Sequence, residues 1–172
     1  MRFLILIAVV CLAACEQHLP EMNQVRGYAP VYSSLGSTQT ISRVSVHSTV
    51  HPGKIYAYEQ YLFQVEETEG IHIIDNSQPQ QAHKIGFLQV PGCSELAIRS
   101  GFLYTNHLGD LVVIDLNNMA SPQVVKRIEG AFPQFSQEYP PFNNVYFECV
   151  DPSKGIVVGW EEKTLDNPKC RR

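Results

Sequence analysis

The sequence predicts an all-β protein made of two four-stranded, blade-like antiparallel sheets and an incomplete third. Along most of the chain, short segments rich in Ile, Val, Tyr and Phe alternate with turns that contain Gly, Pro, Asn or Asp, which is the pattern of antiparallel strands. Residues 55–90 and 96–129 are two copies of one unit, and Asp75 and Asp115 end matching segments 40 residues apart (115 − 75). A repeat of this length is typical of stacked sheets.

The first 14 residues predict an export signal. Arg2 is followed by an unbroken apolar run, which has about half of the roughly 20 residues that a membrane-spanning helix needs. The run ends in Leu12-Ala13-Ala14-Cys15 and resembles the signal of bacterial lipoproteins, which implies that the Cys15 thiol receives a lipid before cleavage. Gln17, two places later, then favours the outer membrane, so the predicted location is the cell envelope. An ordinary secretory signal is the alternative.

Residues 15–40 are predicted to be a tether between the lipid and the folded part. They contain Pro20, Gly36 and a stretch rich in Ser, Thr and Gln, with little periodic apolar content. Such a segment buries too little surface to offset its conformational entropy. The folded region is predicted at 41–172, and it begins with an alternating strand at 41–46.

Each copy of the repeat predicts four strands in the same order. The third strand of each copy is almost continuously apolar, as Ile71-His72-Ile73-Ile74 and Leu111-Val112-Val113-Ile114. Because such strands are usually covered on both faces, each sheet is expected to have a further sheet on each side, as in a partial β-propeller. The predicted strands are 55–58, 61–65, 70–75 and 85–90 in the first copy, and 96–99, 102–106, 110–115 and 124–128 in the second.

Asp75 and Asp115 recur at the end of the third strand in each copy, which raises the hypothesis of a catalytic carboxylate pair. An Asp at a boundary between strand and turn more often accepts hydrogen bonds from the backbone N–H groups that follow it. We therefore predict that both are structural turn residues. The acidic run at 66–69 is interpreted as a solvated turn, because it lacks the ligand spacing of a calcium loop.

After the second copy the pattern changes. A Pro-rich aromatic loop is followed by an incomplete hairpin predicted at 145–160 and by a polar tail. The aromatic residues either bind a partner or cover one end of the sheets. Cys149 and Cys170 could form a disulfide in an oxidising compartment. The candidate recognition residues are Phe132, Phe135, Tyr139 and Phe142, with Tyr146 and Trp160 nearby.

The segment Leu111-Val112-Val113-Ile114-Asp115 resembles the LVIVD repeat, a β-propeller repeat of exported bacterial and archaeal proteins, and 71–75 is a weaker copy. Together with the lipid signal, the chain is similar to uncharacterised LVIVD-repeat lipoproteins of Bacteroidetes-type bacteria. The resemblance implies a fold and a location but no reaction. Since a closed propeller has at least four blades, we expect either a fragment of a longer propeller or self-association through open sheet faces.

Composition and motifs exclude several classes of function. The formal net charge is −4 and no Lys or Arg cluster is present, so nucleic acid is not an expected partner. The six histidines and the cysteines lack metal-ligand spacing, no catalytic motif occurs, and no cofactor is predicted. The sequence therefore favours a membrane-anchored, non-catalytic binding or scaffold module with a protein or glycan partner. A propeller enzyme or its subunit acting on an extracellular polymer, and a truncated fragment without independent function, are the alternatives.

Overall fold

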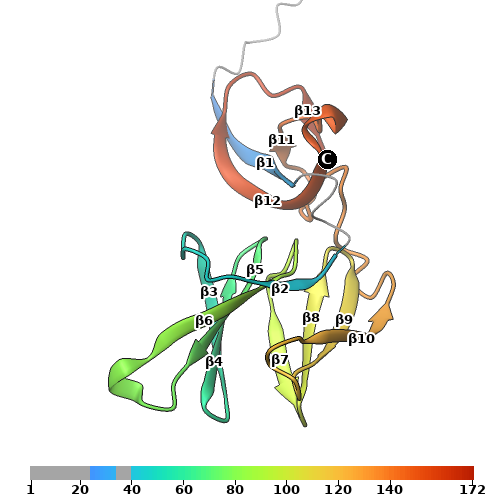
Figure 1. Ribbon diagram of the computed structural model, residues 1–172. Coiled ribbons are helices and arrows are strands. Elements are labelled where there is room, and N and C mark those ends of the chain that lie inside the picture. The colour runs from blue at the N-terminus through green and yellow to red at the C-terminus, as the bar shows by residue number, and fades with distance from the viewer. Residues whose placement is uncertain (1–23, 34–39) are drawn as a thin grey trace, which may run out of the picture.

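The computed structural model describes residues 24–33 and 40–172, and these form three β-sheets and two short 3-10 helices (Figure 1). The all-β prediction is confirmed. The first sheet has the strand order β2-β6-β5-β4-β3, the second β10-β9-β8-β7, and the third β12-β1-β11-β13. The elements are β1 (Val25–Ser33), β2 (Ser42–Val44), β3 (Pro52–Tyr58), β4 (Tyr61–Glu66), β5 (Gly70–Asp75), η2 (Pro79–Gln81), β6 (His83–Gln89), β7 (Leu96–Arg99), β8 (Phe102–His107), β9 (Asp110–Asp115), β10 (Gln123–Ile128), β11 (Tyr146–Phe147), η3 (Pro152–Lys154), β12 (Ile156–Leu165) and β13 (Cys170–Arg171).

The two copies of the repeat form sheets of the same topology. Strands β3 to β6 and β7 to β10 are both antiparallel meanders in which each strand pairs with the next one along the chain. The register is also the same, because Tyr61 pairs with Asp75 and Phe102 pairs with Asp115. The first sheet gains a fifth strand, β2, which pairs with the outer edge of β6.

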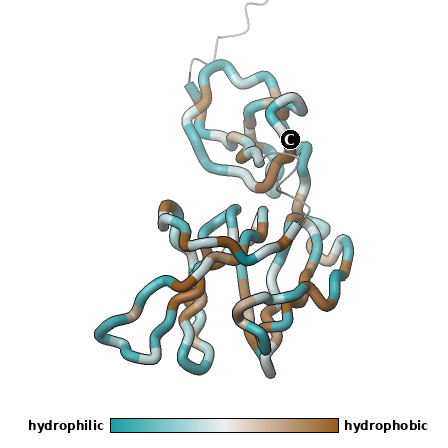
Figure 2. The backbone as a smooth tube through the Cα atoms, in the orientation of Figure 1, coloured by the Kyte–Doolittle hydropathy of each residue, from teal (hydrophilic) through white to brown (hydrophobic). Residues whose placement is uncertain are grey.

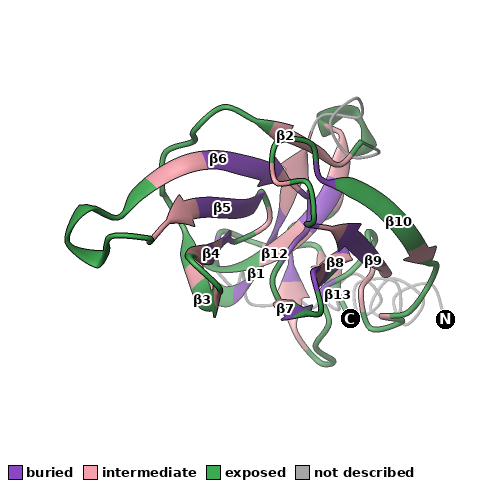
Figure 3. Cartoon of the chain, turned by 60° about the horizontal axis from the view of Figure 1, so that its bottom comes forward, coloured by how far each residue is buried: buried purple, intermediate pink, exposed green. Residues whose placement is uncertain are grey.

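The first and second sheets pack face to face around one core. Phe63 and Ile73 of the first sheet and Leu103 of the second are fully buried in it, and Figure 3 shows buried segments along β5, β6, β8 and β9. Hydrogen bonds also join the sheets, since Tyr56 Oη donates to Ile98 O (3.2 Å) and the Tyr58 hydroxyl accepts from a backbone N–H of the second sheet (2.9 Å). Burial of apolar side chains between the sheets is the main stabilising contribution, and neither sheet could shield its apolar face alone.

The third sheet corrects two predictions. Residues 15–40 are not a tether throughout, because β1 lies in the middle of the third sheet, antiparallel to β12 and parallel to β11. Ala29 in β1 is only 3% exposed, and Gly27 lies so close to β11 that an added Cβ would be 2.4 Å from Tyr146 O. The predicted hairpin at 145–160 is also wrong, since β11 and β12 both pair with β1 instead of with each other.

The third sheet docks on turns of the other two sheets. Gly159 of β12 faces Thr68 in the β4–β5 turn, where an added Cβ would be 2.7 Å from Thr68 Cγ2. Gly92 adopts φ +75° beside Leu108 of the β8–β9 turn and Val158 O, a conformation that favours glycine. Figure 2 shows that hydrophobic residues lie mainly along the strands, with more hydrophilic residues in many of the connections. The three sheets therefore meet at a small set of turns.

Candidate functional site

A cavity of about 420 Å³ lies where the three sheets meet. Its volume is within the range of small-molecule sites in proteins. We call it the junction cavity. Its walls come from the β4–β5 turn, the linker between the first two sheets, the β8–β9 turn, the loop after β10, and β12. The lining residues that matter most are Glu67, Glu95, Asn106, Phe132, Gln134, Phe135 and Trp160.

The aromatic wall of the junction cavity is fixed by backbone hydrogen bonds. Phe132 N–H donates to Gly109 O (2.9 Å), which holds the loop after β10 against the β8–β9 turn. Gly109 also lies beside Phe135, whose Cδ1 would be in ordinary contact with an added Cβ, at 3.7 Å. Trp160 Nε1 donates to Ser136 O (3.0 Å), which ties the same loop to β12. Two of the three rings, Phe132 and Phe135, thus come from the loop after β10, and the third, Trp160, comes from β12.

The predicted recognition aromatics divide into two groups. Phe132 and Phe135 line the junction cavity, together with Trp160. Tyr139 and Phe142 do not line it. The ring of Tyr139 has the Arg172 guanidinium 4.2 Å from its centroid, and Phe142, which is 51% exposed, stacks on Tyr28 with the ring centroids 5.1 Å apart.

The polar wall of the cavity is acidic and carries amides. Asn106 Oδ1 accepts hydrogen bonds from the backbone N–H groups of Ser94 (3.0 Å) and Glu95 (3.1 Å), so its amide fixes the linker that enters β7. The Glu95 carboxylate forms an ion pair with Lys54 (2.5 Å), and Glu67 is exposed. The described lining residues include no Lys or Arg. The cavity therefore suits a neutral or cationic group better than an anion.

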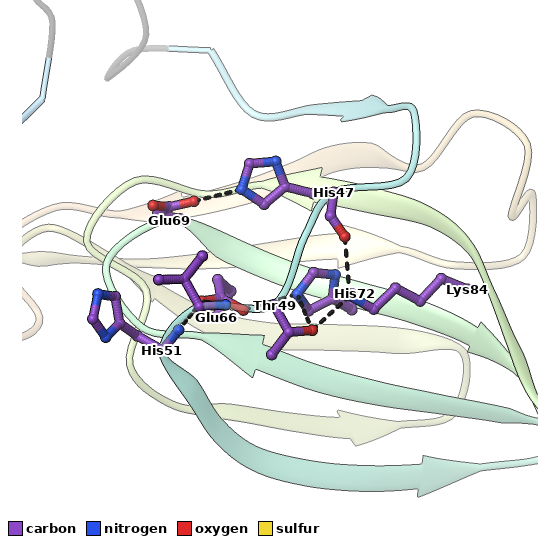
Figure 4. A network of polar contacts seen from close by, with 8 residues as sticks. His47, Thr49, His51, Glu66, Glu69, His72 and Lys84 are labelled. Carbon is purple, nitrogen blue, oxygen red and sulfur yellow. Dashed lines mark hydrogen bonds and ion pairs between the residues drawn. The ribbon is translucent and has the colours of Figure 1, made fainter.

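A buried polar network lies on the outer face of the first sheet (Figure 4). The side chains of Glu66 and His72 are both fully buried, and His72 Nε2 is 2.9 Å from Glu66 Oε2. Glu66 Oε1 accepts hydrogen bonds from the backbone N–H groups of Val50 (2.8 Å) and His51. The interpretation of 66–69 as a solvated turn is therefore wrong for Glu66. We call residues 46–51, which cross this face, the strap.

The strap is held at its other end by further polar contacts. His47 Nε2 lies 2.8 Å from Glu69 Oε2, and the His47 ring stacks on Phe87 with the centroids 4.8 Å apart. Lys84 Nζ donates to His47 O (2.9 Å) and to Thr49 Oγ1 (2.5 Å). Side chains of β4, β5 and β6 thus hold the strap on the first sheet (Figure 4).

The geometry of this network does not allow a proton relay. Thr49 Oγ1 (3.4 Å) and Glu66 Oε2 (2.9 Å) both lie at the same nitrogen of His72, Nε2. Its other nitrogen, Nδ1, has no hydrogen-bond partner among the described residues. A proton relay needs the hydroxyl and the carboxylate on opposite nitrogens of the imidazole. Because Thr49 and Glu66 share one nitrogen of His72, we interpret the three side chains as a structural cluster.

The Glu66 carboxyl is held in its ionised form. Burial raises its pKa, but the hydrogen bonds from His51, His72 and Val50 and the charge of His72 together lower the pKa by more, so that it lies below its ordinary value near 4.5. A buried carboxylate with two backbone donors and an imidazole follows the rule that buried charges are paired and hydrogen-bonded. The cluster therefore fixes the strap to the sheet.

The second sheet carries a polar cluster at the corresponding end. His107 ends β8 as Glu66 ends β4, and Arg127 Nη1 lies 2.8 Å from both His107 Nδ1 and Asp110 Oδ2. The hydrogen bond from Arg127 lowers the pKa of Asp110 below its usual range. The second strand of each repeat thus ends in a buried polar side chain, Glu66 or His107, that has a polar side-chain partner on another strand of its sheet.

The predicted turn residues make the contacts expected of Asx caps. Asp75 Oδ1 accepts from Ser77 N–H, and Asp115 Oδ1 accepts from Asn117 N–H, both at 2.8 Å. The hydrogen bonds from Ser77 also lower the pKa of Asp75. The two carboxylates lie in the turn after β5 and the turn after β9, and neither lines the junction cavity.

The cysteines are placed as follows. Cys149 and Cys170 form a disulfide with a Cα–Cα distance of 5.3 Å, which joins the segment after β11 to β13. Cys93 is a buried free cysteine, and burial raises the pKa of its thiol to about 11. Such a thiol is a poor nucleophile at neutral pH. The predicted lipidation site, Cys15, lies outside the described residues.

No family model, curated protein or solved structure matches this chain. Within residues 24–33 and 40–172, no group of three or more His, Cys, Asp or Glu side chains is arranged to hold a metal ion. In the same part of the chain, no helix has the length and apolar character required to cross a membrane. Function therefore has to be argued from the sites themselves.

Proposed function

We propose that this protein is an exported, lipid-anchored binding module of the LVIVD-repeat, propeller type, and that its junction cavity binds a neutral glycan. The observation that carries the proposal is the cavity itself, in which three aromatic rings face a wall of carboxylates and amides at the meeting point of three sheets. Nothing in the proposal requires a catalytic step.

The propeller-type stacking is supported by the repeat and its packing. Two meanders of identical topology lie face to face, and their first strands, β3 and β7, lie next to each other. Adjacent first strands with the later strands directed outward are the arrangement of neighbouring propeller blades. The LVIVD-like segments are the third strands, β5 and β9.

Export and lipid anchoring are supported from both ends of the chain. The N-terminal segment carries the lipoprotein-type sequence that ends at Cys15. The disulfide between Cys149 and Cys170 fits an oxidising compartment outside the cytosol, where such bonds persist. A cysteine with several acyl chains would give durable attachment to the membrane, whereas one chain alone would be marginal.

A glycan fits the chemistry of the cavity. The CH faces of a sugar ring pack on aromatic side chains such as Phe132, Phe135 and Trp160, while its hydroxyls need carboxylate and amide partners such as Glu67 and Gln134. A few polar groups on an otherwise apolar wall are what orient a small ligand. The absence of Lys and Arg from the described lining argues against phosphate or another anion.

The fluorescence of Trp160, the single tryptophan of the chain, tests the glycan proposal directly. We expect neutral hexose or N-acetylhexosamine oligosaccharides to change its emission in a saturable way. Phe135→Ala should weaken this binding at least about tenfold, the loss of roughly 1.4 kcal/mol, whereas Phe142→Ala, outside the cavity, should not. An unchanged emission with every sugar, or equal binding by the Phe135 variant, would exclude the proposal.

Metabolic labelling with radioactive palmitate tests the anchor. The unaltered chain should be labelled and should fractionate with membranes, and Cys15→Ala should lose both properties. Equal labelling of the two chains would remove the lipoprotein proposal without affecting the glycan proposal.

A further inference from the structure

The second sheet exposes the face that the first sheet buries. In the shared register, the pair Phe63 and Ile73 of the first sheet corresponds to the pair Tyr104 and Val113 of the second. Phe63 and Ile73 are fully buried against the second sheet. Of their counterparts, Tyr104 is 36% exposed and Val113 is 8% exposed. Ile128 is likewise 43% exposed where its counterpart in β6 is almost fully buried, and Figure 3 shows β10 as an exposed strand.

The first sheet leaves the complementary face incompletely covered. The second sheet packs on the first through Leu103 and Ile114, which are almost fully buried. Their counterparts on the outer face of the first sheet are Leu62 and Ile74, which pair with each other and are only partly buried. Ile55, on the same face, is 60% exposed. Each half of the interface between the sheets therefore has an equivalent face on the same chain that the described residues cover only in part.

The strap covers one end of this face. It contacts Glu66, His72 and Lys84, whereas Leu62 and Ile74 are partly exposed and Ile55 is 60% exposed. Val50 and His51 are the two residues before β3, and a side-chain oxygen at the end of β4 accepts both of their backbone N–H groups. Ser94 and Glu95 are the two residues before β7, and Asn106 Oδ1 accepts both of theirs. Both segments are thus held by a side-chain oxygen near the end of the second strand of their repeat, although Asn106 occupies the register position of Val65 and not that of Glu66.

We propose that a second copy of this chain covers both faces. The outer face of the second sheet packs on the outer face of the first sheet of the second copy, and the reciprocal contact closes a two-fold ring of four sheets. Four is the smallest number of blades in a closed propeller, and two-fold closure is the commonest symmetry of soluble homo-oligomers. The inference rests on the propeller-type stacking proposed above, but on neither the lipid nor the glycan.

Sedimentation velocity of the full chain, purified in detergent, tests the ring. The unaltered chain should sediment as a dimer. Tyr104→Asp, on the second sheet, and Ile55→Asp, on the first, should each raise the dissociation constant at least tenfold, because each places an unpaired charge in both contacts. Tyr139→Asp is the matched control, since Tyr139 is equally exposed (38%) but lies on neither face, and it should leave the dimer unchanged.

Mixing the two altered chains separates a head-to-tail ring from other dimers. One contact of the mixed dimer then carries both substitutions and the other carries none, so the mixture of Tyr104→Asp and Ile55→Asp should dimerise more tightly than either variant alone. Far-ultraviolet circular dichroism checks that each variant is folded, and Ile55 is exposed enough that its substitution tests the ring even if Tyr104→Asp unfolds. A monomeric unaltered chain, or an Ile55 variant that dimerises normally, would overturn the inference. The Trp160 titration tests the glycan proposal separately, whichever oligomeric state is found.

Discussion

Replacing Glu66 tests the claim that the strap is held by a buried charged cluster. Glu66→Ala leaves two backbone N–H groups of the strap and the imidazole of His72 without their acceptor in a fully buried site. Each buried donor left without an acceptor typically costs about 1–3 kcal/mol, and we expect urea unfolding at pH 7, followed by circular dichroism, to show a total loss of about 3–5 kcal/mol. Glu66→Gln keeps an amide oxygen for the strap and should cost only about 1–2 kcal/mol.

The same carboxyl predicts a pH dependence. Because its folded pKa lies below its ordinary value near 4.5, the folded state binds the proton less readily than the unfolded state. The stabilisation is therefore fully present above about pH 4.5 and is lost as the pH falls through the folded pKa. The difference in unfolding free energy between the unaltered chain and Glu66→Gln should be constant near neutral pH and should shrink on acidification.

Glu67→Ala is the control for this experiment, because the neighbouring carboxyl is exposed and its loss should change stability by no more than about 0.5 kcal/mol. Other carboxyls with lowered pKa values are present in both chains and cancel in the comparison. If Glu66→Ala cost less than about 1 kcal/mol, or if the difference between the chains did not change with pH, the cluster would not hold the strap as argued.

Three further predictions concern other parts of the fold. Opening the disulfide by Cys149→Ser should lower the unfolding free energy by about 3 kcal/mol, from the chain entropy of a 21-residue loop, and a reductant should have the same effect on the unaltered chain but none on the variant. Gly92→Ala should lower the unfolding free energy by about 2–4 kcal/mol, because φ is +75° and Leu108 Cδ2 would lie 2.9 Å from the added Cβ. Gly130→Ala is the control, since φ is +61° but nothing lies within 4 Å of the added Cβ, and it should cost only about 1 kcal/mol. Equal losses in urea unfolding would contradict the steric argument. Arg127→Met should raise the pKa of Asp110, whose largest lowering contribution is the hydrogen bond from that guanidinium, and a carboxyl titration followed by NMR should show the rise.

The repeat could be predicted because its determinants are local. The apolar strands, the turns and the caps at Asp75 and Asp115 are all set by residues within a few positions of each other. The predicted boundaries of 70–75, 96–99 and 110–115 agree with β5, β7 and β9. The face-to-face packing of the two copies also followed, since each copy carries an apolar strand that needs a cover on both sides.

The third sheet and the buried cluster could not be predicted in the same way. β1 is stabilised by partners far along the chain, and no local pattern distinguishes it from a tether. Glu66 begins an acidic run that is typical of a solvated turn, although it is wholly buried. One signal was available: His72 interrupts an apolar strand and needs a polar partner, and β4 places Glu66 on the same face, two pairs beyond the Gln64–His72 pair. The sequence did not predict the junction cavity; it predicted only that the aromatic residues after the second repeat either bind a partner or cover the sheets, and two of them, Phe132 and Phe135, line the cavity.

The pairing of β1 with β12 has a consequence for the order of folding. Val25 pairs with Leu165, 140 positions later (165 − 25), so β1 cannot form this pairing until β12 has been synthesised. The two repeat sheets, by contrast, are built from contacts between consecutive segments, which form early and quickly. A chain released by the ribosome before β12 would have its first strand unsatisfied and open to proteases or chaperones. The third sheet can therefore form only after residues 156–165 have been synthesised.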